Sequence, residues 1–310
     1  MTPEAVFVDD ACLRRWPLPM PGADGDKEDR GRVLVIGGSP ELAGAVVLAA
    51  IAALRAGAGK LAIATSERVA ASVAIAVPEA RVVALRESGE AGLLLDPRLF
   101  EAAFDAVLIG PGMQDKSATC ALVDAALARA GDARIVLDAA AMEIVRGSAD
   151  PVARRRGRGA TTGSILLTPH AGELARLSGL DKQAILADPS GAASTHAAQW
   201  GLIVALKGAT TVIASPHGNR WVHEGGNIGL AVSGSGDTLA GIIAGLAARG
   251  ATLEQAAAWG VAMHARAGDV LARRFGPLGF LAREIAGEIP MLMESLRQAG
   301  SHASAGFTSG

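Results

Sequence analysis

Tyrosine is absent from the 310-residue sequence, and aromatic residues make up only 3% of it. Proteins that bind single-stranded nucleic acid commonly stack the bases on aromatic side chains, so this class of function is disfavoured. The formal net charge is −2, whereas a general polyanion binder carries an excess of positive charge. We therefore predict that the protein has no nucleic-acid partner.

Cysteine and long apolar runs are also scarce. The two cysteines, Cys12 and Cys120, show neither a CxxC pattern nor zinc-ligand spacing, which is typical of free thiols in a reducing compartment. The longest apolar run, residues 43–54, is too short to span a bilayer and has a helical pattern. The first ten residues lack the basic segment of a signal peptide and include Asp9 and Asp10. These features predict a cytoplasmic protein with no membrane partner.

Short apolar runs alternate with helical patterns along the chain. A strand is expected at Val33–Ile36, a small-residue helix at about residues 44–56 and a second strand at Lys60–Ala64, which together form a βαβ pattern typical of a parallel sheet. Half of the residues are hydrophobic and 39 are glycine, as expected for strands that are buried on both faces and joined by tight turns. The predicted fold class is α/β, with a mostly parallel central sheet and helices on both faces.

One domain is expected to account for most of the chain. Residues 1–30 are polar and turn-rich, and they are expected to form an extended arm or a lead-in that packs on a neighbour. The ordered core is expected to begin at Gly31, so we predict a single domain over residues 31–298. Residues 299–310 are mostly small and polar, which indicates a disordered tail.

Polar or glycine-rich turns follow the expected strands. The carboxyl ends of parallel strands share one edge of a sheet, and open α/β folds bind ligands there, so these turns are expected to converge on one cleft. The turns are Gly37-Gly38-Ser39, Gly110-Pro111-Gly112, Asp138, Thr168-Pro169-His170 and Lys207-Gly208.

The most informative stretch is Gly234-Ser235-Gly236-Asp237, which precedes an expected helix at about Thr238–Arg249. Glycine lets the backbone approach a ligand closely, and a helix start presents free N–H groups and the positive end of the helix dipole. The segment Gly234, Ser235 and Gly236 is therefore predicted to form an anion-binding loop. Asp237 has two interpretations: it caps the helix, or it takes a proton from a hydroxyl that attacks a phosphate.

Three other polar residues at the predicted sheet edge also allow two interpretations each. His170 is either a satisfied turn histidine or a ligand-binding residue. Glu173 is either a first-turn helix carboxylate or an indirect magnesium ligand that acts through water. Lys207 either ends a strand or pairs with a phosphate as a point charge. The remaining residues of interest are interpreted as structural, turn-forming or surface residues: Asn227, His196, His217, His223, His264 and the basic run Arg154–Arg158.

Seven short segments carry a resemblance to a known family. They begin at Gly31, Ala52, Ile109, Val136, Leu167, Leu206 and Gly234 and read GRVLVIGGS, AALRAGAG, IGPG, VLDA, LTPHAGE, LKGATT and GSGD. Together they resemble the ADP/ATP-dependent NAD(P)H-hydrate dehydratases, which are ribokinase-like proteins. The resemblance covers about residues 31–296, and it is specific because the segments occur in the family's order.

The resemblance implies dehydration of the S-epimer of hydrated NADH or NADPH, with consumption of ADP or ATP and release of AMP or ADP and phosphate. Hydroxide is a poor leaving group, and phosphorylation of the hydroxyl allows it to leave as phosphate. The resemblance also implies Mg²⁺ as a cofactor and a homo-oligomer. Because only about thirty residues precede the core, it further implies functional pairing with a separate NAD(P)H-hydrate epimerase.

The same resemblance assigns roles to individual residues. It implies that Asp237 is the base and that the amides of Gly234–Gly236 stabilise charge on the transferred phosphoryl group. The residues expected to hold the nucleotide are Lys207, Gly208, Ala209, Thr210, Thr211 and Gly236. The residues expected to line the hydrate pocket are Ala45, Gly112, His170 and Asp237. Glu173 is the expected indirect magnesium ligand.

The sequence departs from the family's pattern at a few positions. Ala140 stands where the family usually has a second acid, Ile228 replaces a proline, and Val232-Ser233 replaces Thr-Gly. Two competing hypotheses are a ribokinase-like kinase that acts on a vitamin-precursor alcohol, and a regulatory protein that binds nucleotide without turnover. The combination of Thr168-Pro169-His170 with Lys207-Gly208 favours the dehydratase over the kinase.

Overall fold

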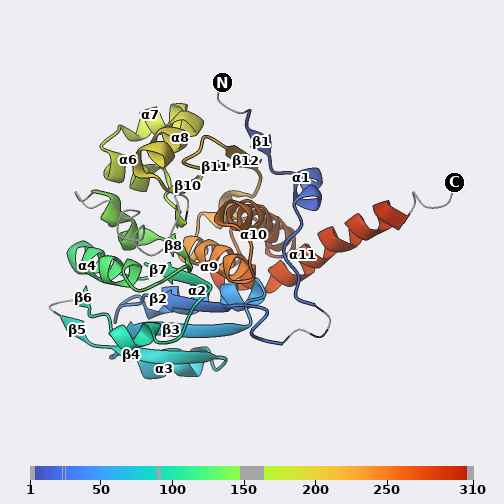
Figure 1. Cartoon of the computed structure of the whole chain (residues 1–310). Helices are drawn as coiled ribbons and strands as arrows, with labels where there is room; N and C mark the ends of the chain where they lie inside the picture. Colours follow the sequence, from blue (N-terminus) through green and yellow to red (C-terminus); the bar gives the residue numbers. More distant parts are fainter. Residues whose placement is uncertain (1–3, 23, 25, 89–91, 147–163, 306–310) are drawn as a thin grey trace.

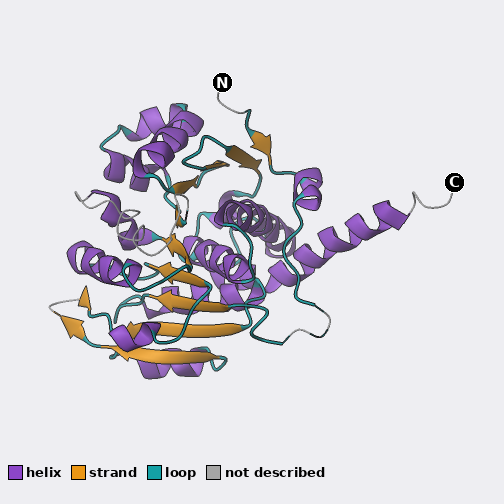
Figure 2. Ribbon diagram, viewed as in Figure 1, coloured by secondary structure: helices purple, strands orange, loops and turns teal. Residues whose placement is uncertain are grey.

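The centre of the molecule is a ten-stranded sheet with helices on both faces (Figures 1 and 2), so the predicted α/β fold class is confirmed. The computed structural model describes residues 4–22, 24, 26–88, 92–146 and 164–305, with only the backbone described for residues 299–305. The basic run Arg154–Arg158 lies outside the described residues.

The sheet is parallel through seven neighbouring strands. Its order is β1-β12-β11-β10-β9-β8-β7-β2-β3-β4, and every neighbouring pair from β10 to β4 is parallel, whereas β11 is antiparallel to β10 and β12. The strands are β1 Val6–Phe7, β2 Arg32–Ile36, β3 Lys60–Ser66, β4 Ala80–Leu85, β7 Ala106–Ile109, β8 Arg134–Leu137, β9 Ile165–Leu167, β10 Ile203–Leu206, β11 Thr210–Ala214 and β12 Arg220–Glu224. A separate antiparallel pair is formed by β5 Glu87–Ser88 and β6 Gly92–Leu93.

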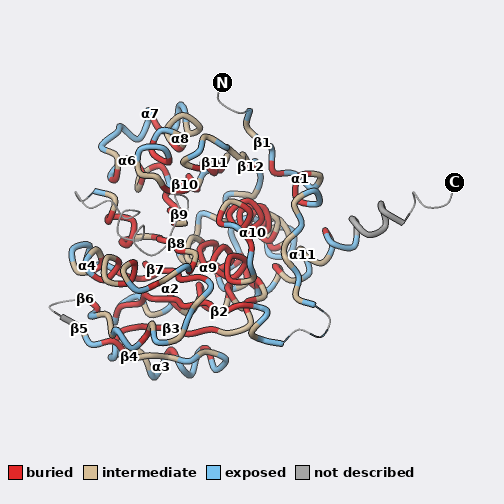
Figure 3. The backbone as a smooth tube through the Cα atoms, viewed as in Figure 1, coloured by how far each residue is buried: buried red, intermediate tan, exposed pale blue. Residues whose placement is uncertain are grey.

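Helices cover both faces of the sheet because the strands bury both faces. In β2, Val33 and Val35 belong to the core that includes residues of α2, α9 and α10, and Leu34 belongs to the core on the opposite face with α4. Figure 3 shows that α9 and α10 are buried along most of their length. The helices are α1 Asp10–Arg15, α2 Ala43–Arg55, α3 Ala70–Ala76, α4 Lys116–Leu127, α6 Ala171–Ser178, α7 Lys182–Ala187, α8 Pro189–Trp200, α9 Ser235–Ala248, α10 Leu253–Phe275 and α11 Ala282–Ala305, with 3₁₀ segments η1 Pro97–Phe100, η2 Ala139–Arg146 and η3 Ile228–Leu230.

Glycines allow α9 to pack closely against α2. A Cβ atom added to Gly241 would overlap the carbonyl oxygen of Ala49, and one added to Gly245 would overlap the carbonyl oxygen of Ala53. The two backbones therefore touch where most helix pairs are separated by side chains. This contact fixes the position of α9, whose first turn carries Asp237.

Residues 4–22 pack on the sheet and helices of their own chain. Strand β1 pairs with β12 at one edge of the sheet, and the Trp16 ring stacks on Trp221 with ring centroids 5.5 Å apart. The indole N–H of Trp259 in α10 donates to the Trp16 carbonyl (2.8 Å), and the Val8 carbonyl lies 2.9 Å from Nδ1 of His223. The N-terminal segment thereby completes the part of the sheet that carries β12.

The C-terminal helix is longer than the sequence indicates. A disordered tail is expected from residue 299, but α11 continues to Ala305. The alanines in this stretch have high helix propensity, which favours continuation of a helix that is already formed. Residues 306–310 lie outside the described part of the chain. Among the described helices, none combines the length and the apolar character that a membrane crossing requires.

Candidate active site

The strand ends that were predicted to converge do lie side by side. The strands β2, β7, β8, β9 and β10 are consecutive neighbours in the sheet and run parallel, so their carboxyl ends form one edge. The turns also contact one another directly: the amide of Gly38 donates to the carbonyl of Pro111 (2.7 Å), and the amide of Lys207 donates to the carbonyl of Pro169 (2.8 Å). This confirms that the predicted turns from β2 to β10 share one edge of the sheet.

A lysine joins the acidic groups at this edge. The Nζ atom of Lys207 lies 3.4 Å from Oδ1 of Asp138 and 3.9 Å from Oε2 of Glu173. The Asp138 side chain is only 5% exposed, and its Oδ1 also accepts a hydrogen bond from Oγ1 of Thr168 (2.6 Å). Burial lowers the pKa of Lys207, but Asp138, Glu173 and Asp237 outweigh burial and raise this pKa above its usual value. Lys207 therefore remains a cation at neutral pH.

Asp237 lies in the first turn of α9. This helix begins at Ser235, three residues before the predicted start at Thr238, because Gly234 ends the preceding loop with a left-handed φ of 88°. The first backbone hydrogen bond that closes a turn of α9 runs from the amide of Thr238 to the carbonyl of Gly234 (3.0 Å). The predicted anion loop is thus the capping residue and first turn of a helix, whose early amides point out of the helix end.

The environment of Asp237 is unusual for a helix-capping carboxylate. Burial, together with the charge of Asp138, raises the pKa of Asp237 to about 6, although Lys207 acts in the opposite direction. A carboxylate with a pKa near neutrality is suited to accept a proton at physiological pH. The sequence interpretation of Asp237 as a simple cap accounts for its position but not for this shift.

A cavity of 710 Å³ opens beside this helix start. Predicted site residues that line it are His170, Lys207, Gly208, Ala209, Thr211, Ser235 and Gly236. Thr210 begins β11 beside these residues, and the Thr211 hydroxyl accepts from the Gly208 amide (3.3 Å), which holds the turn in shape. Gly236 faces Lys207, since a Cβ atom at this position would lie 3.4 Å from the Lys207 Nζ atom.

The residues predicted for the hydrate pocket lie in two places along the edge. Gly112 has a left-handed φ of 70°, and a Cβ atom at this position would lie 3.0 Å from the Cβ atom of Ala45. These two residues are therefore neighbours, Gly112 in the turn after β7 and Ala45 in the first turn of α2. His170 lies at the end of β9 and faces the 710 Å³ cavity instead.

His170 and Glu173 have clear structural roles. The Nδ1 atom of His170 accepts hydrogen bonds from the amides of Gly172 (3.0 Å) and Glu173 (3.2 Å), and Oε2 of Glu173 accepts from the amide of His170 (2.8 Å). The two side chains thereby cap α6 reciprocally. Among the described residues, no group of three or more His, Cys, Asp or Glu side chains is arranged to hold a metal ion. This arrangement is compatible with a magnesium ion held largely by water and phosphate oxygens.

Two histidines that were expected to be structural or surface residues also line the 710 Å³ cavity. His223 comes from β12, and its Nε2 atom has no hydrogen-bond partner among the described residues. His264 comes from α10, and its Nε2 atom lies 3.0 Å from Oγ of Ser235. Asn227 was expected to shape a turn, and it does so: its Oδ1 atom accepts from the amide of Gly229 (2.9 Å) at the start of η3.

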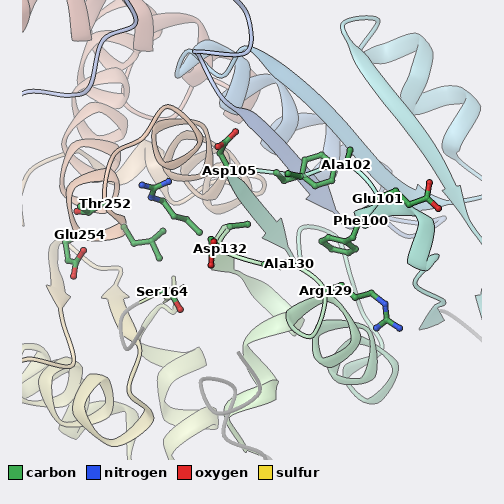
Figure 4. A pocket seen from close by; sticks show the side chains of 16 residues that line it. Phe100, Glu101, Ala102, Asp105, Arg129, Ala130, Asp132, Ser164, Thr252 and Glu254 are labelled. Carbon is green, nitrogen blue, oxygen red and sulfur yellow. The ribbon is translucent and has the colours of Figure 1, made fainter. Parts of the chain in front are cut away.

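A larger cavity, of 910 Å³, lies at the opposite edge of the sheet (Figure 4). It is lined near the start of β7 and β8 by acidic groups such as Asp105 and Asp132, and by Glu254 at the start of α10. None of the predicted site residues lies there. The smaller cavity, at the carboxyl edge of the strands, is the one that contains most of the predicted nucleotide-binding residues.

The mostly parallel sheet, with a partly buried carboxylate in the first turn of α9, matches the ribokinase-like class of proteins. A crystal structure of a ribokinase-like superfamily protein from Enterococcus faecalis V583 aligns with a TM-score of 0.77 at 26% identity, covering 94% of this chain and 96% of that chain. The crystal structure of the ADP/ATP-dependent NAD(P)H-hydrate dehydratase from Bacillus subtilis, co-crystallised with ATP/Mg²⁺, aligns with a TM-score of 0.79 at 29% identity, covering 94% and 99%.

The sequence comparisons narrow this class to one family. The family model described as NAD(P)H-hydrate dehydratase matches residues 33–291. The ADP-dependent (S)-NAD(P)H-hydrate dehydratase of Xanthomonas campestris pv. campestris is 48% identical over 297 residues, which cover 95% of this chain and 98% of the relative. The chain belongs to the NAD(P)H-hydrate dehydratase family.

Proposed function

We propose that the protein uses ADP or ATP to dehydrate the S-epimer of hydrated NADH or NADPH, restoring the reduced nicotinamide nucleotide. The observation that carries this proposal is the partly buried Asp237 carboxylate, which lies in the first turn of α9 near the Lys207 charge. The relative from Xanthomonas campestris is named for this reaction and is similar over nearly the whole chain. A nicotinamide-repair role follows from the same reaction.

Asp237 acts as the general base in the first step. It takes the proton from the hydroxyl group of the hydrate, and the hydroxyl oxygen attacks the terminal phosphorus of the nucleotide, so that AMP leaves from ADP or ADP leaves from ATP. The hydrate now carries a phosphate ester in place of its hydroxyl group. Elimination of phosphate, with loss of a proton from the adjacent ring carbon, restores the double bond of the dihydropyridine.

The nucleotide is held beside the first turn of α9. The Gly236 amide at this helix start faces the charge that develops on the transferred phosphoryl group, and Lys207 supplies a positive charge. The remaining proposed nucleotide-binding residues are Gly208, Ala209, Thr210 and Thr211. Magnesium, when bound, neutralises phosphate charge, and Glu173 is the residue proposed to hold it through water.

The hydrate is proposed to lie along the strand ends, against Ala45, Gly112 and His170, with its hydroxyl group toward Asp237. The exposed ring of His170 offers its Nε2 atom as a polar contact. The cavity next to Lys207 accommodates the phosphates that react with this hydroxyl group.

Several broader features remain part of the proposal. We propose a domain over residues 31–298, a homo-oligomeric assembly, and a cytoplasmic location, which the free cysteines Cys12 and Cys120 support. Action on one epimer alone also implies functional pairing with a separate epimerase that converts the other epimer. Light scattering of the purified protein tests the assembly.

The test of the proposed activity is an absorbance assay at the reduced-nicotinamide band with purified hydrate, ADP or ATP, and magnesium. The proposal predicts a rise in absorbance with release of one phosphate per hydrate. A stable phosphomonoester without a rise in absorbance would identify a small-molecule kinase of the same fold. Nucleotide binding without consumption would identify a regulatory protein.

A further inference from the structure

Ser235 and His264 form a buried contact at the start of α9. The Nε2 atom of His264 lies 3.0 Å from Oγ of Ser235 and 3.2 Å from the carbonyl oxygen of the same residue. Ser235 is 4% exposed and His264 is 9% exposed. Both residues line the 710 Å³ cavity together with Gly236 and Lys207.

The contact with the carbonyl group determines which atom carries the proton. A carbonyl oxygen only accepts hydrogen bonds, so the Nε2 atom of His264 must be the donor in the 3.2 Å contact with Ser235. The same N–H group then also faces Oγ of Ser235, which accepts. Burial lowers the pKa of His264 to about 4, so the ring is neutral and carries a single N–H group at physiological pH.

This arrangement leaves the hydroxyl proton of Ser235 available. Because Nε2 of His264 has no lone pair to offer in this tautomer, the Ser235 hydroxyl group cannot donate to it and must donate elsewhere. Ser235 is the first residue of α9, next to the amide of Gly236 and two residues before Asp237. The cavity that Ser235 and Lys207 both line is available to hold a ligand that accepts the hydrogen bond from this hydroxyl group.

We propose that the Ser235 hydroxyl group is a side-chain donor to the phosphate of the bound nucleotide and that His264 is the positioning residue that orients it. The proposal rests on the proposed function for the identity of the anion, and it adds a donor to the backbone amides of the helix start. Without the imidazole N–H group, the hydroxyl group would turn to a nearby backbone carbonyl, as serine commonly does at helix ends.

The test is a double-mutant cycle measured by calorimetric titration with ADP. Ser235→Ala should weaken ADP binding about tenfold, as expected for loss of a hydrogen bond to a charged group. His264→Leu should weaken ADP binding by a similar factor. The double variant should bind ADP no more weakly than Ser235→Ala alone, because both substitutions remove the same donor, the Ser235 hydroxyl group. His264→Gln, which places an amide N–H group near the same point, should restore affinity to within about threefold of the wild type.

A purely structural role for His264 predicts other results. In that case the effects of the two substitutions would multiply in the double variant, and His264→Gln would be as damaging as His264→Leu. Unchanged ADP affinity in Ser235→Ala would overturn the proposal by itself, even if His264→Leu failed to fold. The matched control is His196→Leu, which removes a buried histidine of α8 that contacts the Ala192 carbonyl and does not line the cavity.

The dehydration assay separates this proposal from the proposed function. If the wild type dehydrates the hydrate, Ser235→Ala should lower kcat by about 10²-fold, as loss of one donor to a transition-state oxyanion typically does. If the wild type binds ADP with the predicted coupling but does not dehydrate the hydrate, the proposed function fails and the role of Ser235 and His264 stands. Dehydration without coupling in the ADP titrations contradicts this proposal alone.

Discussion

The Nζ atom of Lys207 lies 3.4 Å from Oδ1 of Asp138, which joins the ends of β10 and β8 across β9. The pair is largely buried, with Lys207 19% and Asp138 5% exposed. The Asp138 carboxylate helps to keep Lys207 charged, and it also helps to raise the pKa of Asp237 to about 6. The edge therefore holds a lysine that stays charged and a separate carboxylate with a pKa near neutrality.

Nucleotide binding should stabilise the fold, and this effect should depend on Lys207. A ligand present at one hundred times its dissociation constant adds about 2.7 kcal/mol to the free energy of unfolding. Thermal melts with millimolar ADP or ATP and magnesium measure it. Lys207→Met should abolish most of the shift, whereas Lys182→Met, at an exposed position of α7, should leave it unchanged. The absence of a shift with both nucleotides in the wild type would rule out the proposed site.

Asp237 should make the stability of the protein depend on pH. Because the pKa of Asp237 is raised to about 6 in the folded state, the folded protein binds more protons than the unfolded chain between about pH 4 and pH 6, and stability falls as pH rises through this range. Asp237→Asn should therefore be more stable than the wild type at pH 7 by about 2 kcal/mol, and the gain should vanish near pH 4. Urea unfolding at both pH values measures this difference. An equal difference in stability between the variant and the wild type at both pH values would show that the pKa of Asp237 is not raised.

The protein should act on one epimer of the hydrate. A fixed base and a fixed phosphoryl donor present one geometry to the hydroxyl group, and the Xanthomonas campestris relative is named for the S-epimer. With separated epimers, the protein should consume the S-epimer. The R-epimer should disappear only as fast as it converts spontaneously to the S-epimer. Equal enzymatic rates on both epimers, with no epimerase added, would contradict this prediction.

The close contact of α2 and α9 should be sensitive to a single methyl group. Gly241→Ala places a Cβ atom against the carbonyl oxygen of Ala49, so the helices must separate and the protein should lose about 2 kcal/mol of stability. The control is Gly287→Ala in α11, where no atom lies within 4 Å of the added Cβ and helix propensity predicts a gain of up to about 1 kcal/mol. Denaturant unfolding of both variants provides the comparison, and a neutral Gly241→Ala would show that the helices tolerate separation.

Much of the sheet was predictable because its central strands are buried on both faces. Val33–Ile36, Ala106–Ile109 and Ile165–Leu167 are short continuous apolar runs that end at glycine or polar residues, and each run lies within an observed strand. Strand β12 was not predicted. Its sequence, Arg220–Glu224, mixes charged and aromatic residues, and the strand lies near one edge of the sheet. Such a strand depends on its pairing with β11 and β1, which the local sequence does not encode.

Site residues could be predicted where they follow a strand or a glycine-rich segment. They could not be predicted where they lie within a long helix. Lys207 stands out in the sequence because it directly follows an apolar strand, and Asp237 because it follows the glycine-rich segment Gly234–Gly236. His264 does not, because a histidine on the buried side of a long helix has the same local pattern whether it serves packing or a site. Its contact with Ser235 spans 29 residues of sequence, and the raised pKa of Asp237 depends on Asp138 from a separate strand. Both properties arise only from tertiary packing.

The most direct test of the central claim is steady-state dehydration by Asp237→Asn, measured beside calorimetric titration with ADP. Asparagine keeps the size of the side chain but cannot accept the hydroxyl proton as a carboxylate does, so turnover should fall by at least about 10²-fold. ADP affinity should stay within about threefold of the wild type or increase, because a negative charge beside the phosphates is removed. The matched control is Asp181→Asn, the capping residue of α7, which should retain full turnover. If Asp237→Asn keeps more than about a tenth of wild-type turnover, Asp237 is a capping residue and not the base.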